Sequence, residues 1–579
     1  MSAFAQEAQG PAFTIDVRAP KEVRGTIERN IELQRYREVT DLDDAELARL
    51  ITSAERNVRE LVATQGYFDP KISVRREGAA GRPVIVVEVQ PGALTHVERT
   101  KIDFEGAIAD AHEPDDLAQQ DEIRKGWRLP DGHRFTQEDW SDAKTHALRQ
   151  LVQRRYPAGR ISYSLADVDA PASRASLGLR LDSGPLFRLG PMRVTGMQRY
   201  DPVLVPRLAR LPEGSVYDQD EITQAQLRLT GSGYFDTAFI YVDPQGDPKA
   251  APVEVTVREA PLHRIVFGPG VSTDSGARLT LEYRNNRVPV IDWRAVTKLQ
   301  LERKSPFIET EWTAIPRESG WRWGVLARAE RVDDGSVLTH AQRLRIGQTW
   351  AGAHIERNVY VQYDRATVQA SPGVTTATVP DIGDGEAVSA NYVWTGRYFD
   401  RLPYPTRGYG IAAELGGGIT LTGSRSPFTR TVLRGLWIKP LDDGRIQLRG
   451  EIGAVLAKAS ARVPSTQMFR TGGDTTVRGY GYREIGIEQN GIVTPGRYEM
   501  VASFEWQKPI RRGGVETNFE SVLFLDSGAV ADRVGNLKPV YGVGTGVRYK
   551  SPLGPIEAAV AYGLQSKKFR LHFTLGMTF

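Results

Sequence analysis

The chain has 579 residues, with 75 Lys plus Arg against 71 Asp plus Glu, no Cys, and a formal net charge of +4. So small a charge, spread over interspersed acidic and basic residues, argues against a nucleic-acid-binding protein. Without Cys there is no disulfide framework, no thiol catalysis and no Cys-based zinc site. The sequence also lacks an uncharged apolar run of about 18 residues, which argues against a helical membrane span. A membrane barrel stays open, because it needs only segments of about ten alternating residues.

The first 260 residues contain a short leader and three copies of one pattern. Ala3-Phe4-Ala5 has the small-x-small form of a signal cleavage box, so we expect residues 1–11 to be a leader remnant or tag. Each copy has an opening strand, a helical middle, an aromatic turn and a closing pair of strands. We therefore expect three β-α-α-β-β domains at residues 12–92, 93–185 and 186–260.

The aromatic turns and the helices give the repeats their register. The turns are Gly66-Tyr67-Phe68-Asp69, the degenerate Arg155-Tyr156-Pro157, and Gly233-Tyr234-Phe235-Asp236. In the first copy, apolar residues between Leu47 and Val62 fall on one helical face, which we interpret as core rather than as a binding groove. Thr136 and Asp218 begin box-like caps, which predict helix starts in the second and third copies.

From about residue 261 to residue 579 the hydrophobic pattern has period two. Residues 445–452 alternate apolar and polar side chains, and residues 569–579 do the same at the end of the chain. At about 20 residues per strand and connection, this region holds about 16 strands. Eight of the ten Trp lie in it, as expected for interfacial aromatic girdles. We therefore favour an all-β transmembrane barrel over residues 261–579; a soluble sandwich, with its polar faces outside, is the alternative.

Several motifs of the second half resemble those of one family. Residues 471–480, Thr-Gly-Gly-Asp-Thr-Thr-Val-Arg-Gly-Tyr, resemble the signature loop of the outer-membrane assembly-factor superfamily. Residues 268–276 look like its first barrel strand, and residues 524–528 look like the strand that faces the signature loop; residues 551–556 and the terminal Phe579 complete the set. The resemblance implies periplasmic polypeptide-transport-associated (POTRA) repeats followed by a 16-stranded barrel in the outer membrane.

Within that superfamily, three repeats and this length most resemble the TamA type, the barrel subunit of translocation and assembly modules. BamA-type assembly factors carry five repeats, and two-partner secretion transporters carry two. The resemblance implies an insertase for autotransporters and other outer-membrane barrel proteins. It also implies an inner-membrane-anchored, TamB-like periplasmic partner, unfolded clients and the lipid bilayer as partners. No cofactor, metal or nucleic acid is expected.

The resemblance also assigns roles to residues of the signature loop, Val477, Arg478, Gly479 and Tyr480. In this family the arginine lies at the tip of a loop folded back into the barrel, where it meets acidic residues of the inner wall. The matching wall positions are Asp526 and Glu505, with Gly528 in the same strand motif. A guanidinium in a partly desolvated lumen needs a carboxylate, which its planar fork can bond twice. The alternative is an ordinary surface turn.

Gly542, Gly544 and Gly546 alternate along one predicted strand, so three positions that face the same side of the wall have no side chain. We expect them to leave room for an inserted loop. A plain bend is the alternative. A dinucleotide fingerprint is disfavoured, because the glycine spacing is wrong and no helix follows.

The seam between the first and last barrel strands is the functional candidate that this architecture implies. Gly268, Pro269 and Gly270 near the start of the first strand remove a donor and side-chain packing, and Phe573 and Phe579 lie on the last strand. A weak seam opens sideways and offers its edge to an incoming strand. The alternative is an ordinary strand entrance.

The sequence contains no signature of an enzyme. None of the eight His forms an H-E-x-x-H pattern, and G-x-S-x-G and Walker motifs are absent. A hydrolase assembled around a lumen-facing His572 is the enzymatic alternative. Two further alternatives are a transporter that secretes polypeptides through the lumen and a passive porin.

Overall fold

The computed structural model describes residues 12–39, 42–78, 83–110, 113–272, 276–335, 337–371, 382–401, 404–551 and 554–575. The leader predicted at residues 1–11 and the terminal Phe579 lie outside this part of the chain. The chain divides into two compact units. One holds the first two repeats with residues 211–226 and 239–256, and the other holds the barrel with residues 196–210 and 227–238. The third repeat therefore contributes to both units.

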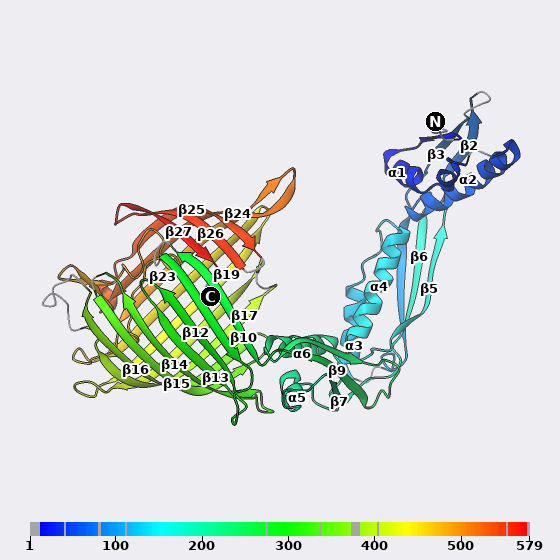
Figure 1. Ribbon diagram of the computed structural model, residues 1–579. Coiled ribbons are helices and arrows are strands. Elements are labelled where there is room, and N and C mark those ends of the chain that lie inside the picture. Colours follow the sequence, from blue (N-terminus) through cyan, green and yellow to red (C-terminus); the bar gives the residue numbers. More distant parts are fainter. Residues whose placement is uncertain are drawn as a thin grey trace, which may run out of the picture. The chain divides into compact units, whose positions relative to one another are not determined.

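Each repeat forms a three-stranded sheet with helices between its first and second strands (Figure 1). The first repeat comprises β1 (Thr14–Arg18), α1 (Lys21–Asn30), the 3-10 helix η1 (Glu32–Tyr36), α2 (Asp44–Thr64), β2 (Lys71–Glu77) and β3 (Val84–Gln90). The second comprises β4 (His96–Glu105), α3 (Pro114–Lys125), α4 (Gln137–Gln153), β5 (Arg160–Asp169) and β6 (Arg174–Asp182). The third comprises β7 (Leu189–Thr195), α5 (Leu204–Ala209), α6 (Gln219–Gly231), β8 (Phe235–Val242) and β9 (Ala251–Glu259).

In all three sheets the last strand of the repeat lies in the middle, parallel to the first. The central strand is therefore flanked on both sides, and its alternate side chains are buried, as Leu177, Leu179 and Leu181 are in β6. The predicted stripe on α2 is confirmed: Leu47, Ala54, Val58 and Val62 are buried in the first repeat. The predicted cap is also confirmed at Thr136, whose hydroxyl accepts a hydrogen bond from the Asp139 N–H.

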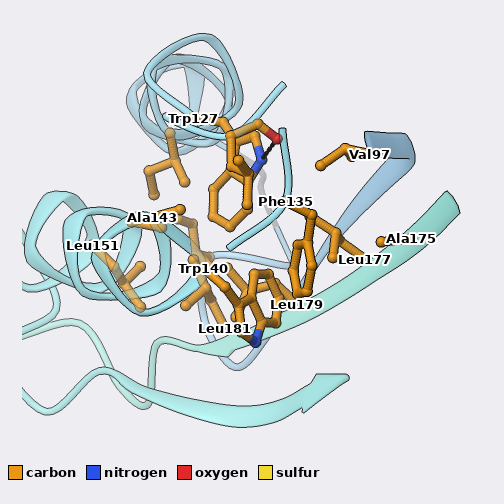
Figure 2. Packing of buried hydrophobic residues seen from close by; sticks show 14 of the residues in the cluster. Val97, Trp127, Phe135, Trp140, Ala143, Leu151, Ala175, Leu177, Leu179 and Leu181 are labelled. Carbon is orange, nitrogen blue, oxygen red and sulfur yellow. Dashed lines mark hydrogen bonds between the residues drawn. The ribbon is translucent and has the colours of Figure 1, made fainter. Parts of the chain in front are cut away.

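The second repeat has the richest aromatic core (Figure 2). Trp127 and Trp140 meet edge to face at 6.0 Å, over the leucines of β6. The turn at Tyr156 looked degenerate in the sequence, yet its side chain is fully buried and its hydroxyl donates to Asp116 Oδ1 at 2.6 Å. Burial and the neighbouring Asp116 carboxylate raise the pKa of Tyr156. Tyr156 therefore anchors its turn as Tyr67 and Tyr234 do in the other repeats, where they are also buried.

Sixteen strands form one antiparallel barrel sheet in chain order, broken only by the short hairpin β21 (Ile487–Gln489) and β22 (Ile492–Thr494) (Figure 1). Its first half is β10 (His263–Ser272), β11 (Gly276–Asn285), β12 (Arg294–Glu302), β13 (Phe307–Thr313), β14 (Trp321–Asp333), β15 (Val337–Ala351), β16 (Ile355–Ala370) and β17 (Gly385–Phe399). Its second half is β18 (Gly408–Thr420), β19 (Pro427–Leu441), β20 (Gly444–Ala457), β23 (Tyr498–Arg512), β24 (Val515–Ala531), β25 (Val540–Ser551), β26 (Gly554–Gly563) and β27 (Lys568–Leu575), with the 3-10 helix η3 (Val534–Asn536) between β24 and β25.

The barrel strands turn apolar side chains outward and polar side chains inward. On β16, Val359 and Val361 are exposed on the outer face, whereas Tyr360 between them and Gln362 and Asp364 beyond them are buried inside. A soluble sandwich would bury the apolar face instead, so the arrangement is that of a membrane barrel. Among the described residues, none of the helices is long and apolar enough to cross a membrane.

Hydrogen bonds fix the short segment that connects the third repeat to the first barrel strand. The Tyr200 hydroxyl donates to the carbonyl of Ala260 at 2.8 Å, and the Asn286 side-chain amide donates to the carbonyl of Pro261 at 3.0 Å. The Glu259 carboxylate accepts hydrogen bonds from the backbone N–H groups of residues 198–200, at 2.9 to 3.0 Å. These bonds fix the chain immediately before β10 begins at His263.

Candidate functional site

The signature loop is the long connection from β20 to β23, residues 458–497. Val477 is fully buried, and only 5% of Arg478 and of Tyr480 is exposed. A surface turn would leave an arginine in water, so this alternative is excluded. The loop lies within the barrel against its inner wall, as its contacts with β23, β24, β26 and β27 establish.

Arg478 is the most heavily bonded residue of the loop. Its Nε and Nη2 atoms donate to the two carboxylate oxygens of Asp526 at 2.7 and 3.0 Å, and its backbone N–H donates to Asp526 Oδ2 at 3.0 Å. The same Nη2 atom also lies 2.8 Å from Glu505 Oε1, and Nη1 donates to Glu557 Oε1 at 2.9 Å. The guanidinium also lies over the Phe524 ring, 3.5 Å from its centroid. Three carboxylates and one aromatic ring therefore surround the cation.

Strand alternation places these partners on one wall. Ser503 and Glu505 of β23 and Phe524 and Asp526 of β24 all face inward, and Ser503 is the ladder partner of Asp526. The Ser503 hydroxyl donates to Asp526 Oδ1 at 2.6 Å, which holds this carboxylate in place for Arg478. A bidentate pair between Arg478 and Asp526, whose carboxylate is held by the Ser503 hydroxyl, is both strong and specific in geometry.

Arg548 of β25 and Glu557 of β26 complete the charge network, and our sequence analysis did not assign them to it. Arg548 donates to Glu505 at 2.9 Å and to Glu557 at 2.5 Å. The two residues are cross-strand partners beyond the tight turn at Ser551 and Gly554, which also pair. Arg548 lies three residues before Ser551, and Glu557 lies three residues after Gly554. Antiparallel pairing of the two strands therefore predicts from the sequence that Arg548 and Glu557 lie opposite each other. Two cations thus share three buried carboxylates, with Asp526 and Glu505 as predicted neighbours of Arg478.

The glycines of the wall differ in what they accommodate. A Cβ at Gly528 would lie 2.6 Å from Val477, and a Cβ at Gly542 would lie 1.8 Å from the carbonyl oxygen of Arg478. Both positions therefore let the loop approach the wall. The expectation for the other two glycines of β25 is corrected: a Cβ at Gly544 would first meet Val560 and Phe524, and one at Gly546 would first meet Ala558 and Ala559. Their missing side chains make room for wall residues rather than for the loop.

The signature loop also bonds the last strand. Gly479 N–H donates to His572 Nε2 at 2.9 Å, and the other ring nitrogen of His572 bonds the Asp474 carboxylate. Arg570 donates to Glu484 at 2.9 Å, and the Tyr480 hydroxyl donates to Gln565 in the turn before β27 at 2.7 Å. Both nitrogens of His572 are thus engaged by the loop. The loop connects β27 to the network around Arg478.

The seam lies between β10 and β27. The two strands bring Cα atoms within 8 Å of each other, but among the described residues they share no strand ladder. Gly268, Pro269 and Gly270 lie within β10 and are paired with β11, opposite Thr280, Leu279 and Arg278. On the outer face of the two edges Phe267 is 69% exposed and Phe569 is 75% exposed. Phe573 lies on β27, whereas Phe579 falls outside the described residues.

Comparisons with known proteins agree with this architecture. The Omp85 superfamily domain matches residues 298–579, and the first POTRA domain of the TamA type matches residues 19–91, which together make up more than half of the chain. BamA from Haemophilus ducreyi lacking POTRA domains 1–3 has a similar structure, with a TM-score of 0.57 and 16% sequence identity over 84% of this chain and 100% of that chain. That likeness concerns the fold.

Two curated relatives match parts of the chain. A SAM50-like protein of Schizosaccharomyces pombe is 27% identical over 237 residues, 39% of this chain and 47% of that protein. The chloroplastic outer envelope protein 80 of Arabidopsis thaliana is 35% identical over 117 residues, 19% of this chain and 15% of that protein. The chain thus spans about half the length of the first and less of the second.

Proposed function

We propose that this chain, which belongs to the Omp85 superfamily, inserts and assembles outer-membrane barrel proteins, autotransporters among them. It acts in the outer membrane with its repeats in the periplasm, without a cofactor and without enzymatic chemistry. A TamB-like protein anchored in the inner membrane is its partner. The driving force is strand pairing together with burial of apolar client faces in lipid.

The observation that carries this proposal is the seam, where two neighbouring edge strands lack a ladder among the described residues. An unpaired strand edge presents a row of free backbone donors and acceptors, which a client strand can pair with. The edges of the repeat sheets, such as β2 and β5, offer the same pairing to an unfolded client on its way to the seam. The client then leaves sideways into lipid.

The signature loop supports an insertase over a passive porin. It brings Val477, Arg478 and Tyr480 into the lumen as buried residues, and Arg478 and Gly479 bond four strands of the wall, β23, β24, β26 and β27. A wide pore for small solutes would need this loop to leave its network of ion pairs. We therefore expect small and unsteady conductance in planar bilayers.

A disulfide lock tests the proposal. The chain has no Cys, so two engineered cysteines can form a disulfide only with each other within one chain. Pro269 on β10 is replaced by Cys and combined in turn with Cys at Phe569, Leu571 or Phe573 on β27, because a disulfide forms only where the Cα atoms come within about 7 Å. Oxidised protein in proteoliposomes should lose client assembly, and reduction should restore it.

The matched control joins two ordinary ladder partners, Val547 on β25 and Ala558 on β26. This cross-link should leave assembly unchanged. Normal assembly with the seam locked would contradict lateral release, and continued export of a polypeptide under that lock would favour a secreting transporter instead.

A further inference from the structure

A group of arginines lies where the third repeat meets the barrel. Arg210 follows α5, and Arg294 and Arg322 lie near the starts of β12 and β14. Arg322 alternates with Trp323, which is exposed on the outer face, so Arg322 faces the inner side of the wall. Arg294 lies on the inner side by the same rule, because Leu299 and Leu301 of β12 face outward.

No carboxylate pairs with these three arginines among the described residues. Arg210 donates to the carbonyl oxygens of Ala351 at 2.6 Å and of Gly320 at 3.3 Å, and Arg294 donates to that of Ser232. A carbonyl oxygen accepts a hydrogen bond from a guanidinium group, but it carries no negative charge that would neutralise the positive charge of the arginine. Arg322 has neither a hydrogen bond nor an ion pair with any described residue. Glu282 of β11 is already bonded to Arg284 at 2.7 Å, and Glu311 of β13, which also faces inward, forms no ion pair with any of the three arginines among the described residues.

Arg328 shows what an ordinary lumen arginine looks like on the same strand face. It lies six residues further along β14 and is paired with Glu309 at 3.1 Å and with Glu330 at 2.7 Å. Arg343 of β15 is likewise paired with a carboxylate, that of Asp364, at 2.9 Å. Arg322, on the same strand face as Arg328, lacks the carboxylate partners that Arg328 has among the described residues.

A buried hydroxyl points to the same place. Tyr234 is 5% exposed, and its hydroxyl has no hydrogen-bond partner among the described residues. Burial raises the pKa of Tyr234 to about 12, against the opposing effect of the positive charges of Arg294 and Arg322. Burial also lowers the pKa of Arg210, and the charges of Arg228 and Arg322 lower it further. Buried polar groups normally have partners, so a missing acceptor at this point would satisfy both the hydroxyl and the cations.

We propose that Arg322, with Arg210 and Arg294 beside it, binds a carboxylate of the polypeptide client as it enters the barrel. The inference rests on the proposed function and names what this part of the protein recognises. A carboxylate matches the planar guanidinium fork and accepts a hydrogen bond from a tyrosine hydroxyl. An acidic side chain and a chain terminus share this chemistry. A lipid headgroup is disfavoured, because Arg322 and Arg294 face the inner side of the wall rather than its lipid-facing side.

Peptide binding to the full-length protein in zwitterionic nanodiscs tests the proposal. The probes are three dye-labelled ten-residue peptides of alternating Val and Thr: one with a central Asp and an amidated end, one with Asn at that place and an amidated end, and one with Asn and a free terminal carboxylate. A charge-assisted bond predicts that the Asp peptide binds about tenfold more tightly than the amidated Asn peptide in low salt. The third peptide shows whether a chain terminus serves equally.

Arg322→Gln should abolish the preference for the Asp peptide, and Tyr234→Phe should reduce it. The matched control is Arg328→Gln on the same strand face, which should retain the preference because Arg328 is already paired. Folding of each variant is checked by resistance of the barrel to detergent unfolding. Equal binding of all three peptides to the unmodified protein would overturn the inference, and so would a preference that survives Arg322→Gln.

Two further arms separate this inference from its rivals and from the proposed function. Loss of the preference in nanodiscs of anionic phospholipid, or displacement of the Asp peptide by millimolar inorganic phosphate, would mean a general anion site and would overturn client recognition. Client assembly is measured in parallel. If the unmodified protein assembles clients without preferring the Asp peptide, this inference fails and the proposed function stands. If it assembles none, the proposed function fails.

Discussion

The second repeat and the barrel lumen stabilise their interiors in opposite ways. In the repeat, Trp127, Trp140 and the leucines of β6 form an apolar core, and the few buried polar groups serve the turns (Figure 2). In the lumen, by contrast, guanidinium groups and carboxylates neutralise one another around Arg478. An apolar core loses stability in proportion to the volume removed, whereas a buried charge network fails when one partner leaves the others uncompensated.

The lumen should therefore show the largest effect of a single substitution. Arg478→Ala leaves the buried Asp526 without a cation, and Glu505 and Glu557 with Arg548 alone, and should destabilise the inserted loop by about 3–5 kcal/mol. We expect rapid hydrogen exchange over residues 471–485 in the variant, together with loss of client assembly. The control is Arg434→Ala, which breaks a more exposed pair with Glu451 and should leave both readouts close to those of the unmodified protein. Unchanged exchange after Arg478→Ala would show that the network does not hold the loop.

The repeat should respond to lost volume instead. Leu179→Ala removes a buried side chain from β6 and should cost about 2–5 kcal/mol of local stability, seen as faster hydrogen exchange in the second repeat of the full chain. Leu117→Ala, at a position 55% exposed, is the matched control and should change little. Exchange in the barrel strands should stay as it was in both variants. An effect of Leu179→Ala on the lumen loop would show that the two interiors are coupled.

The smallest effect is expected at Glu259, where a carboxylate is satisfied by backbone donors rather than by an arginine. Burial raises the pKa of Glu259, but three backbone N–H groups outweigh it, so the pKa lies below its ordinary value. Such a group contributes stability above its unfolded pKa of about 4.3, and this stability is lost as the pH falls through the lower folded pKa.

Glu259→Gln should consequently speed hydrogen exchange of residues 198–200 at neutral pH. The difference between the variant and the unmodified protein should shrink as the pH falls below about 4. Arg193, whose ion pair with Glu254 is exposed on the neighbouring strands, offers the control substitution Arg193→Gln, with little expected change at either pH. A difference that stayed constant with pH would rule out the carboxylate as its source.

The same contrast explains what the sequence could predict. Alternation predicts the barrel and the repeat cores because it depends only on neighbouring residues, as with Val359 and Val361 outside and Gln362 inside. The resemblance of residues 471–480 predicted that Arg478 meets Asp526 and Glu505. The turn at Tyr156 looked degenerate because Pro157 stands where the other copies have Phe-Asp, and the partner that anchors Tyr156, Asp116, lies on another element 40 residues away.

Other features depend on closure of the barrel and had no local signal. The bond between Gly479 and His572 joins residues 93 positions apart, and it exists only because β27 passes beside the inserted loop. The absence of a ladder between the described parts of β10 and β27 likewise depends on how the two ends of the sheet meet. Gly544 and Gly546 shared their alternation with Gly542, but the side chains opposite them, and not the spacing, decide what each one accommodates.

Site-specific photo-cross-linking during client assembly tests lateral release most directly. The cross-linker replaces Phe267 on β10 or Leu571 on β27, both exposed beside the seam, or Leu415 on β18, which is 51% exposed elsewhere on the barrel. If clients leave through the seam, an arrested client is captured at Phe267 and Leu571 and is not captured at Leu415. Equal capture at all three positions, or capture at none of them while the client still assembles, would contradict lateral release.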